Sequence, residues 1–311
     1  MATMIKTVNL TKRYGSRVAL SNLNLEIAEG DCFGFIGPNG AGKTTTIKIL
    51  ATLLQPTWGE ARICDLVIGF QSRQIRPLIG YVPDYFGAYE DMAVQEYLEF
   101  FAAAYNINGP ARAKIVNDVL ELTDLGYKRD APVDGLSRGM KQRLSIARVL
   151  VHDPRVLLLD EPAGNLDPRA RIEMRELLKE LRRMGKTILI SSHILPELAD
   201  LCNTVGIIEK GELLYSGPVA DIVRRARAGT VLHVAVANNQ AAAQALLGQN
   251  PNVQSIAAND GHLEIALKTG VTDYSFIPRQ LIAAGFKLML LKEEEVNLET
   301  AFMRLTKGMV Q

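Results

Sequence analysis

The stretch Gly37-Pro38-Asn39-Gly40-Ala41-Gly42-Lys43-Thr44 decides the fold of this chain. A short apolar run suited to a buried strand, Cys32–Ile36, precedes it, and a segment with helical character, 44–54, follows it. A glycine-rich loop between a strand and a helix that ends in Gly-Lys-Thr matches the pattern of phosphate-binding loops, G-x-x-x-x-G-K-[ST]. Because strand, loop and helix stand in the required order, the pattern favours a phosphate-binding loop over a chance glycine-rich turn.

The chemistry expected of this loop follows from its backbone. Glycines let successive N–H groups turn toward phosphate oxygens, and the start of the following helix carries about half a positive charge. Lys43 would reach the β- and γ-phosphates of a nucleoside triphosphate, and the Thr44 hydroxyl would bind Mg²⁺. The loop residues expected to bind the nucleotide are Gly37, Pro38, Asn39, Gly40, Ala41, Gly42, Lys43, Thr44 and Thr45.

A second stretch ends in two carboxylates. Val156–Asp160 has the composition of a buried strand, and Glu161 follows it directly. Asp160 suits a role in holding Mg²⁺, directly or through water, and Glu161 is placed to polarise a water toward the γ-phosphate. Apolar strands often end in aspartate, so this pattern is weak alone. It becomes specific beside the phosphate-binding loop.

His193 follows another strand-like run, 187–191. Taken alone, one histidine of four would be interpreted as a structural residue. After a parallel strand of the same sheet, however, its side chain would point into the crevice where ligands bind. We therefore expect His193 to contact the γ-phosphate, as a third catalytic residue beside Lys43 and Glu161.

The order of elements predicts an α/β protein in the first part of the chain, which begins with two segments, 4–14 and 18–27, that alternate like antiparallel strands. Strands that alternate with helices imply a largely parallel sheet that is covered on both sides. Pro168 at the start and Gly185 at the end of one long segment match the usual ends of a helix. The predicted strands are 4–14, 18–27, 32–36, 156–160, 187–191 and 205–209, and the predicted helices are 94–105, 111–122, 144–151 and 168–184. The helical insertion spans about 84–152.

The character of the sequence changes after Gly229. The expected order there is β-α-β-β-α-β, the ferredoxin-like plan, with Asn259-Asp260-Gly261 as a hairpin turn and a closing helix at 298–305. About 80 residues can bury a modest core, so we expect a nucleotide-binding domain at 1–228 and a small α+β domain at 229–311. The predicted strands of this domain are 231–236, 253–257, 262–267 and 287–291, and the predicted helices are 240–247 and 275–284.

Composition narrows the classes of protein. The chain has 311 residues, 35 basic against 34 acidic, so no global charge would steer it toward nucleic acid. No apolar run approaches the ~20 residues of a membrane helix, and the start lacks the apolar stretch of a signal peptide. We therefore expect a cytoplasmic protein. Three scattered cysteines, Cys32, Cys64 and Cys202, predict neither a disulfide framework nor a zinc site, and buried thiols are expected.

With these motifs in place, the chain resembles the ATP-binding cassette (ABC) ATPases over roughly residues 1–225. The further motifs occur in the family's order before, between and after the two nucleotide motifs. They are a signature motif at Leu136-Ser137-Arg138-Gly139-Met140-Lys141-Gln142-Arg143, a D-loop at Asn165-Leu166-Asp167-Pro168, an H-loop at Ser191-Ser192-His193 and an adenine-stacking aromatic at Tyr14. Six ordered motifs are far more specific than a phosphate-binding loop alone.

The resemblance implies ATP hydrolysis by two cassettes that pair head to tail. ATP bound at one phosphate-binding loop is then covered by Ser137 and Gly139 of the partner, whose hydroxyl and backbone N–H groups complete the cage around the γ-phosphate. Ser137 can also serve as an ordinary N-cap of a helix, and the two roles are compatible. Both half-sites are present in this sequence, so a homodimer is the simpler expectation and a paired, different cassette is the alternative.

Four positions in three motifs depart from the family pattern. Arg138 and Met140 stand where the common signature has Gly and Gln, and Asn165 stands where many members have Gly. Asp84 replaces the glutamine of the Q-loop, at the end of Gly80-Tyr81-Val82-Pro83-Asp84. Aspartate is shorter but still offers an oxygen, so we expect Asp84 to hold Mg²⁺ together with Thr44 and Asp160, either directly or through a water of the ion.

Within the family, the chain most resembles the cassettes that serve ABC-2-type exporters. The resemblance rests on the signature, on the acidic Q-loop position, on 166–171, and on a small C-terminal domain with a final Leu298-Glu299-Thr300-Ala301-Phe302. It implies a separate permease, which would hold the cassette at the inner face of the membrane. The segment 85–92, with Tyr85, Phe86 and Tyr89, is where the permease would dock, unless these aromatics pack the helical insertion.

The rival class is a soluble ABC machine that acts on DNA or ribosomes. DNA-repair members contain a long coiled coil and translation factors contain two cassettes, and this sequence has neither feature. Nearly balanced charge also disfavours a nucleic-acid partner. A non-hydrolysing regulator is disfavoured by intact Lys43, Asp160, Glu161 and His193. The C-terminal domain has no second phosphate-binding loop, so we expect it to regulate or brace the dimer.

Overall fold

The computed structural model describes residues 2–84, 87, 91–226, 230–259, 261–268, 270–271 and 273–294. The chain divides into two compact units, Met1–Val219 and Ala220–Gln311. Each unit is described by itself below. The expected aromatic docking residues Tyr85, Phe86 and Tyr89, and the expected closing helix at 298–305, lie outside the described residues.

The first unit begins with an antiparallel sheet whose strand order is β2-β1-β4-β5. Its strands are β1 (Thr3–Tyr14), β2 (Arg17–Ala28), β4 (Trp58–Ile63) and β5 (Leu66–Val67). β1 and β2 form a hairpin that turns at Gly15, where φ is +57°. Along β2 buried and more exposed side chains alternate from Leu23 to Ile27, because successive side chains of a strand point to opposite faces.

A six-stranded sheet forms the centre of the same unit, in the order β10-β9-β3-β8-β7-β6. The strands are β3 (Cys32–Ile36), β6 (Ile79–Val82), β7 (Val156–Asp160), β8 (Thr187–Ser192), β9 (Thr204–Glu209) and β10 (Glu212–Pro218). All neighbours are parallel except β9 and β10. Every residue of β3, β7 and β8 is buried, as expected for central strands covered on both faces.

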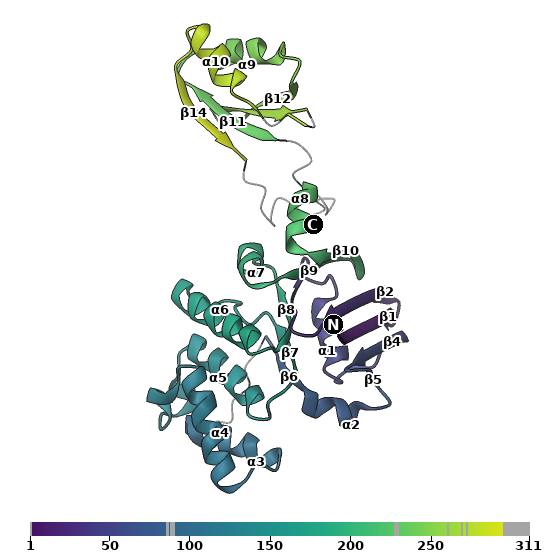
Figure 1. Cartoon of the computed structure of the whole chain (residues 1–311). Helices are drawn as coiled ribbons and strands as arrows, with labels where there is room; N and C mark the ends of the chain where they lie inside the picture. Colours follow the sequence, from purple (N-terminus) through teal and green to yellow (C-terminus); the bar gives the residue numbers. More distant parts are fainter. Residues whose placement is uncertain are drawn as a thin grey trace. The chain divides into compact units, whose positions relative to one another are not determined.

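Helices α3, α4 and α5 gather into one group beside β6 (Figure 1), whereas α1 packs against β7 of the central sheet and α6 packs against α5 and α7. The helices of the unit are α1 (Lys43–Leu50), α2 (Ser72–Ile75), α3 (Val94–Ala104), α4 (Gly109–Leu122), α5 (Arg138–Leu150), α6 (Pro168–Arg183) and α7 (Leu195–Leu201). The largely parallel sheet and the antiparallel and helical parts of the predicted α/β fold are thus confirmed.

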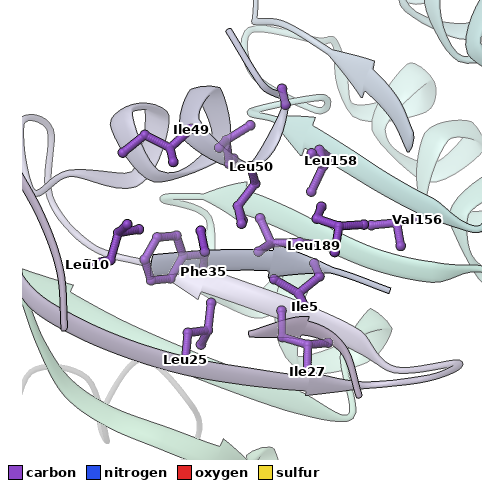
Figure 2. Close-up of a cluster of buried hydrophobic side chains, with 14 of the residues drawn as sticks. Ile5, Leu10, Leu25, Ile27, Phe35, Ile49, Leu50, Val156, Leu158 and Leu189 are labelled. Atoms are coloured by element: carbon purple, nitrogen blue, oxygen red, sulfur yellow. The ribbon is translucent and has the colours of Figure 1, made fainter. Parts of the chain in front are cut away.

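One apolar cluster joins the two sheets to α1. Figure 2 shows Phe35, Leu158 and Leu189 of the central sheet facing Ile5 and other side chains of the antiparallel sheet, with α1 packed beside them. These side chains are almost wholly removed from water, which stabilises the fold by roughly 1.5–3 kcal/mol for each large side chain. The cluster therefore sets the position of the loop between β3 and α1.

The structure corrects three predictions. Helix α5 begins at Arg138 and not at residue 144, because the Ser137 hydroxyl accepts a hydrogen bond from Met140 N and caps the helix there. The helix after the loop ends at Leu50, not at residue 54, because Thr52 has a left-handed φ of +61° and the N–H groups of Leu53 and Leu54 return to the carbonyl of Lys48. Residues 80–82, expected as part of a loop, belong to strand β6. Gly80 permits this strand to approach β7, since a Cβ there would lie 2.9 Å from Leu157 Cδ2.

Several elements were not predicted at all: α2, α7, β4, β5, β10 and, at 219–226, α8. β5 has two residues and α2 has four, which is too short for a periodic pattern to be detected. β10 is half exposed and pairs antiparallel at the edge of a sheet that the sequence pattern describes as parallel. Its existence depends on pairing with β9 and not on its own composition.

The second unit contains α8 (Val219–Ala226), which crosses the division at residue 219, and the order β11, α9, β12, β13, α10, β14. Its elements are β11 (Val231–Val236), α9 (Gln240–Gly248), β12 (Val253–Asn259), β13 (His262–Leu267), α10 (Phe276–Ala283) and β14 (Leu288–Glu293). The four strands form one antiparallel sheet in the order β12-β13-β11-β14. Helices α9 and α10 lie on one face of this sheet (Figure 1), and their side chains share a separate core with it.

All three cysteines are free thiols. Cys32 and Cys202 are buried with their sulfurs 3.7 Å apart, and burial raises the pKa of Cys202, whereas Cys64 is only half-buried.

Within the described residues, none of the helices combines the length and the apolar composition that crossing a membrane requires.

Candidate nucleotide-binding site

The loop between β3 and α1 is held in a shape that only glycine can adopt at two positions. Gly42 precedes the helix with φ +114°, and a Cβ there would lie 2.6 Å from Leu20 Cδ2. A Cβ on Gly37 would lie 2.3 Å from the carbonyl oxygen of Ile208 in β9. The loop therefore packs closely against β2 and β9, and it continues directly into the first turn of α1.

A cavity of about 420 Å³ opens in front of this loop. The volume lies in the range of small-molecule sites. Its lining consists of Tyr14, Arg17, Ala19, Asn39, Gly40, Ala41, Gly42, Lys43, Thr44, Thr45, Asp84 and Glu161. Ten of these residues were expected from the sequence, and they come together from the first hairpin, the phosphate-binding loop, the end of β6 and the end of β7.

Lys43 carries the buried positive charge of the site. Its side chain is only 6% exposed, and its Nζ donates hydrogen bonds to the carbonyl oxygens of Gly37 at 2.6 Å and Pro38 at 3.3 Å. Glu161 Oε1 lies 3.7 Å from Nζ. Burial lowers the pKa of Lys43, and the carboxylates of Glu161 and Asp160 oppose that shift. A buried ammonium needs anionic partners, and the phosphates of a nucleotide would compete with Glu161 for it.

Asp160 and Thr44 form the hard-oxygen pair beside the loop. Thr44 Oγ1 donates to Asp160 Oδ1 at 3.2 Å, and Ser191 Oγ donates to the same oxygen at 2.7 Å. Burial raises the pKa of Asp160, and these two hydrogen bonds oppose the shift. A hydroxyl and a carboxylate at this separation are ligands of the kind that Mg²⁺ prefers, so the donor set fits that ion.

Glu161 is held in an uncommon backbone conformation. Its φ is +50°, and its N–H is directed at β8, where the hydroxyl of Ser191 accepts at 3.0 Å and the carbonyl at 3.2 Å. Non-glycine residues in this region store strain, which concentrates at functional sites. The carboxylate lies between two cationic or titratable groups, because His193 Nδ1 is 2.8 Å from Oε2 while Lys43 faces Oε1.

Three residues of the site had no role assigned from the sequence: Ser191, Arg17 and Ala19. Ser191 is the register partner of Asp160 in the neighbouring parallel strand, and its hydroxyl links that carboxylate to the backbone of Glu161. Arg17 lines the cavity from the start of β2. Ser191 could have been predicted as a site residue, because it is a serine near the carboxyl end of an apolar strand. Arg17 lies in an exposed hairpin, where no sequence pattern indicates a binding residue.

We expect Ser191→Ala to move the acidic limb of the ATPase pH profile to higher pH. The Ser191 hydroxyl lowers the pKa of Asp160, so its removal raises that pKa, and the carboxylate is then lost at a higher pH as pH falls. Steady-state hydrolysis measured across pH tests this. Ser192→Ala is the matched control, because the Ser192 hydroxyl accepts from Ile194 N and does not contact Asp160. An unchanged limb in Ser191→Ala would contradict this role, and Ser191→Thr should restore it.

The signature residues lie elsewhere in the unit and do not line this cavity as the described residues outline it. Ser137 caps α5, since its Oγ accepts a hydrogen bond from Met140 N at 3.3 Å. Gly139 allows α5 to approach α6, because a Cβ there would lie 2.7 Å from Ala170 Cβ. Asn165 has φ +56°, a left-handed conformation that asparagine tolerates better than most residues, which accounts for its standing in place of Gly.

Asp84 of the Q-loop and Tyr14 at the end of β1 both line the cavity. The negative charge of Asp84 contributes to the raised pKa of Asp160 and, together with burial, to the raised pKa of Tyr81, about 12. The Tyr14 ring is about half exposed, with Lys12 Nζ 5.2 Å from its centroid. An exposed ring at the edge of a phosphate-binding cavity is available to stack on a base.

A phosphate-binding loop on a parallel sheet, with an Asp-Glu strand end and a histidine after the next strand, defines the class of P-loop ATPase cassettes. Residues 20–164 match a family model described as "ABC transporter". Relatives of nearly the same length agree, and the chain belongs to the ABC transporter family. The structure agrees with this family assignment, because the first unit has the fold of ABC transporter ATP-binding subunits of known structure.

Two relatives and one solved structure show the extent of the similarity. The Nod factor export ATP-binding protein I of Burkholderia orbicola (strain AU 1054) is 35% identical over 96% of this chain and 95% of its own. The bacitracin transport ATP-binding protein BcrA of Bacillus licheniformis is 34% identical over 99% of both chains. A dimeric ATP-binding cassette in a post-hydrolysis state, bound to ADP and Pi, has a TM-score of 0.63 and 29% identity over 69% of this chain and 98% of its own.

Proposed function

We propose that this chain binds and hydrolyses ATP to power export through a separate ABC-2-type membrane permease. The observation that carries the proposal is Glu161, whose carboxylate is held between Lys43 and His193 at the edge of the phosphate cavity. The two relatives that span the whole chain are export and transport ATP-binding proteins, which supports the cellular task.

Each residue of the site has a distinct role in this reaction. Lys43 neutralises charge on the β- and γ-phosphates, and the loop N–H groups orient them. Thr44 and Asp160 would hold Mg²⁺, with Asp84 as a further oxygen ligand, and the ion would neutralise charge on the phosphates. Glu161 accepts a proton from the water that attacks the γ-phosphorus, while the bond to the β–γ bridging oxygen breaks and ADP leaves.

Further hydrogen-bond donors to the γ-phosphate come from His193 and from a second cassette. His193 lies beside Glu161 and donates to a γ-phosphate oxygen as charge shifts during cleavage. Ser137 and Gly139 of a second cassette provide the remaining hydroxyl and N–H groups. Their distance from the cavity of their own chain supports pairing of two copies, and so does the dimeric state of the similar solved structure.

A second hollow in the first unit suits the permease. It has a volume of about 250 Å³ beside α3, α5 and β6, and its lining includes Leu53, Arg76, Tyr81, Phe101, Tyr105 and Arg148. Two arginines and His152, among aromatic and apolar residues, fit a cytoplasmic helix of the permease that carries apolar and acidic side chains. The cassette would thereby be held at the inner face of the membrane.

The nucleotide groups all belong to the first unit, so we propose that residues after about 229 regulate or brace the dimer and take no part in catalysis. This division follows the domains expected at 1–228, with its helical part at about 84–152, and at 229–311. The lining of the nucleotide cavity consists entirely of residues before position 162, which supports the assignment.

Site-specific crosslinking in membranes tests the permease assignment. We expect a photo-reactive amino acid at Leu53, which is 62% exposed in the second hollow, to capture an integral membrane protein with about six spans, identified by mass spectrometry. The same group at Met184, 54% exposed at the end of α6, is the matched control and should not capture it. Capture of only soluble proteins from Leu53, or equal capture from both positions, would contradict the proposal.

A further inference from the structure

We propose that His233, His262 and Glu264 form a site for one divalent transition-metal ion in the second unit. Each of these side chains is partly exposed and offers one ligand atom, and the three atoms all lie within 4.8 Å of one another. The site lies on β11 and β13, in a different unit from the phosphate cavity. The proposal therefore stands independently of the proposed function.

The alternation of the strands brings these three residues together. His262 and Glu264 are two residues apart on β13 and point to the same face of the sheet. His233 is the register partner of Glu264 on the neighbouring strand β11. Leu263, between His262 and Glu264, and the two neighbours of His233 on β11, Leu232 and Val234, point the other way, into the core shared with α9 and α10. A one-residue slip in register would separate the three ligands.

The distances permit coordination after small rotations of the side chains. The two imidazole rings have centroids 5.1 Å apart, and His262 Nε2 lies 3.7 Å from Glu264 Oε1. Ligand atoms around a tetrahedral Zn²⁺ are about 3.3 Å apart when each is about 2 Å from the ion. The small residues Ala257 and Ala266 neighbour the group on the same face, so they leave the side chains room to close.

The ligand types select the class of ion. Two imidazoles and one carboxylate suit Zn²⁺, Ni²⁺ or Cu²⁺, whereas Mg²⁺ and Ca²⁺ prefer sites made only of oxygen. Three protein ligands leave at least one coordination position for water or another donor. Lys292 is the register partner of His233 on β14, and its ammonium opposes a cation there, so we expect moderate affinity. Two of the four histidines of the chain stand in this one group.

Zinc binding by the full chain tests the proposal. A protein without a histidine tag, stripped by chelator and free of nucleotide, is titrated with ZnCl₂ by calorimetry. We expect one equivalent to bind with Mg²⁺ present in excess. His233→Ala and His262→Ala should each weaken binding at least about tenfold, the lower bound for loss of a group that merely supports a metal ligand. Circular dichroism shows whether each variant keeps its fold.

His193→Ala is the matched control, because His193 lies beside a carboxylate in the nucleotide site and is another place where zinc could bind. Loss of the zinc equivalent in His193→Ala, with full binding in His233→Ala, would overturn the proposal. So would the absence of any zinc binding. X-ray absorption of the zinc-loaded parent decides the case without variants: two imidazole nitrogens at about 2.0 Å support the site, and their absence refutes it.

Discussion

Replacing Lys43 with alanine is expected to weaken ATP binding by roughly 10- to 150-fold, because a charged hydrogen-bonding group contributes about 1.5–3 kcal/mol. The side chain is buried with Glu161 as its nearest carboxylate, so its removal leaves the phosphate cavity net negative. Binding of a fluorescent ATP analogue with Mg²⁺ measures the change directly. Hydrolysis should fall further, since charge on the γ-phosphate is then opposed by fewer donors.

Lys48→Ala is the matched control for this experiment. Lys48 lies in the last turn of the same helix and is exposed, so its loss removes one positive charge without touching the cavity. We expect its ATP affinity to match that of the parent. If Lys43→Ala bound and hydrolysed ATP as the parent does, the assignment of the phosphate-binding loop would be wrong.

Replacing Glu161 with glutamine should lower the rate of hydrolysis by ~10²–10⁴, the usual contribution of a general base. Glutamine keeps the length and hydrogen-bonding capacity of the side chain but cannot accept the proton from water. ATP binding should persist because Lys43 and the loop are unchanged. We therefore expect Glu161→Gln to accumulate as an ATP-bound dimer, which light scattering with Mg²⁺ and ATP detects.

The control for this variant is Glu180→Gln, which changes an exposed glutamate of α6 that pairs with Arg183. Its turnover should equal that of the parent, and it should form no long-lived dimer. Turnover at the parent rate in Glu161→Gln, together with no ATP-dependent dimer, would show that another group activates the water. His193→Ala would then be the next variant to assay, given its contact with Glu161.

The phosphate-binding loop could be predicted because its determinants are local. Gly42 must adopt φ +114°, Lys43 and Thr44 must follow it, and a strand and helix must flank the loop, all within about 20 residues. The central strands were predicted for a similar reason, since five successive buried residues in β3 and β7 leave an apolar run that is easy to recognise. The family assignment, which rests on these motifs, was confirmed.

The prediction failed where an element depends on its neighbours. β6 contains Gly80 and was expected as a loop, yet it forms a strand because Gly80 fits against β7. The helix that begins at Lys43 ends early at Leu50 because Thr52 turns the chain, which nothing in the apolar pattern marks. β10 is a strand only because β9 offers an edge for it.

Contacts between distant residues were decided by tertiary structure. Ser191 reaches Asp160 and Glu161 because β7 and β8 pair in one particular register, and His233 meets Glu264 for the same reason in β11 and β13. The alternation of side chains along a strand indicates which face a residue occupies, but it does not specify which residue of the next strand lies opposite. That choice is made when the cores pack, since only one register buries the apolar face of both strands.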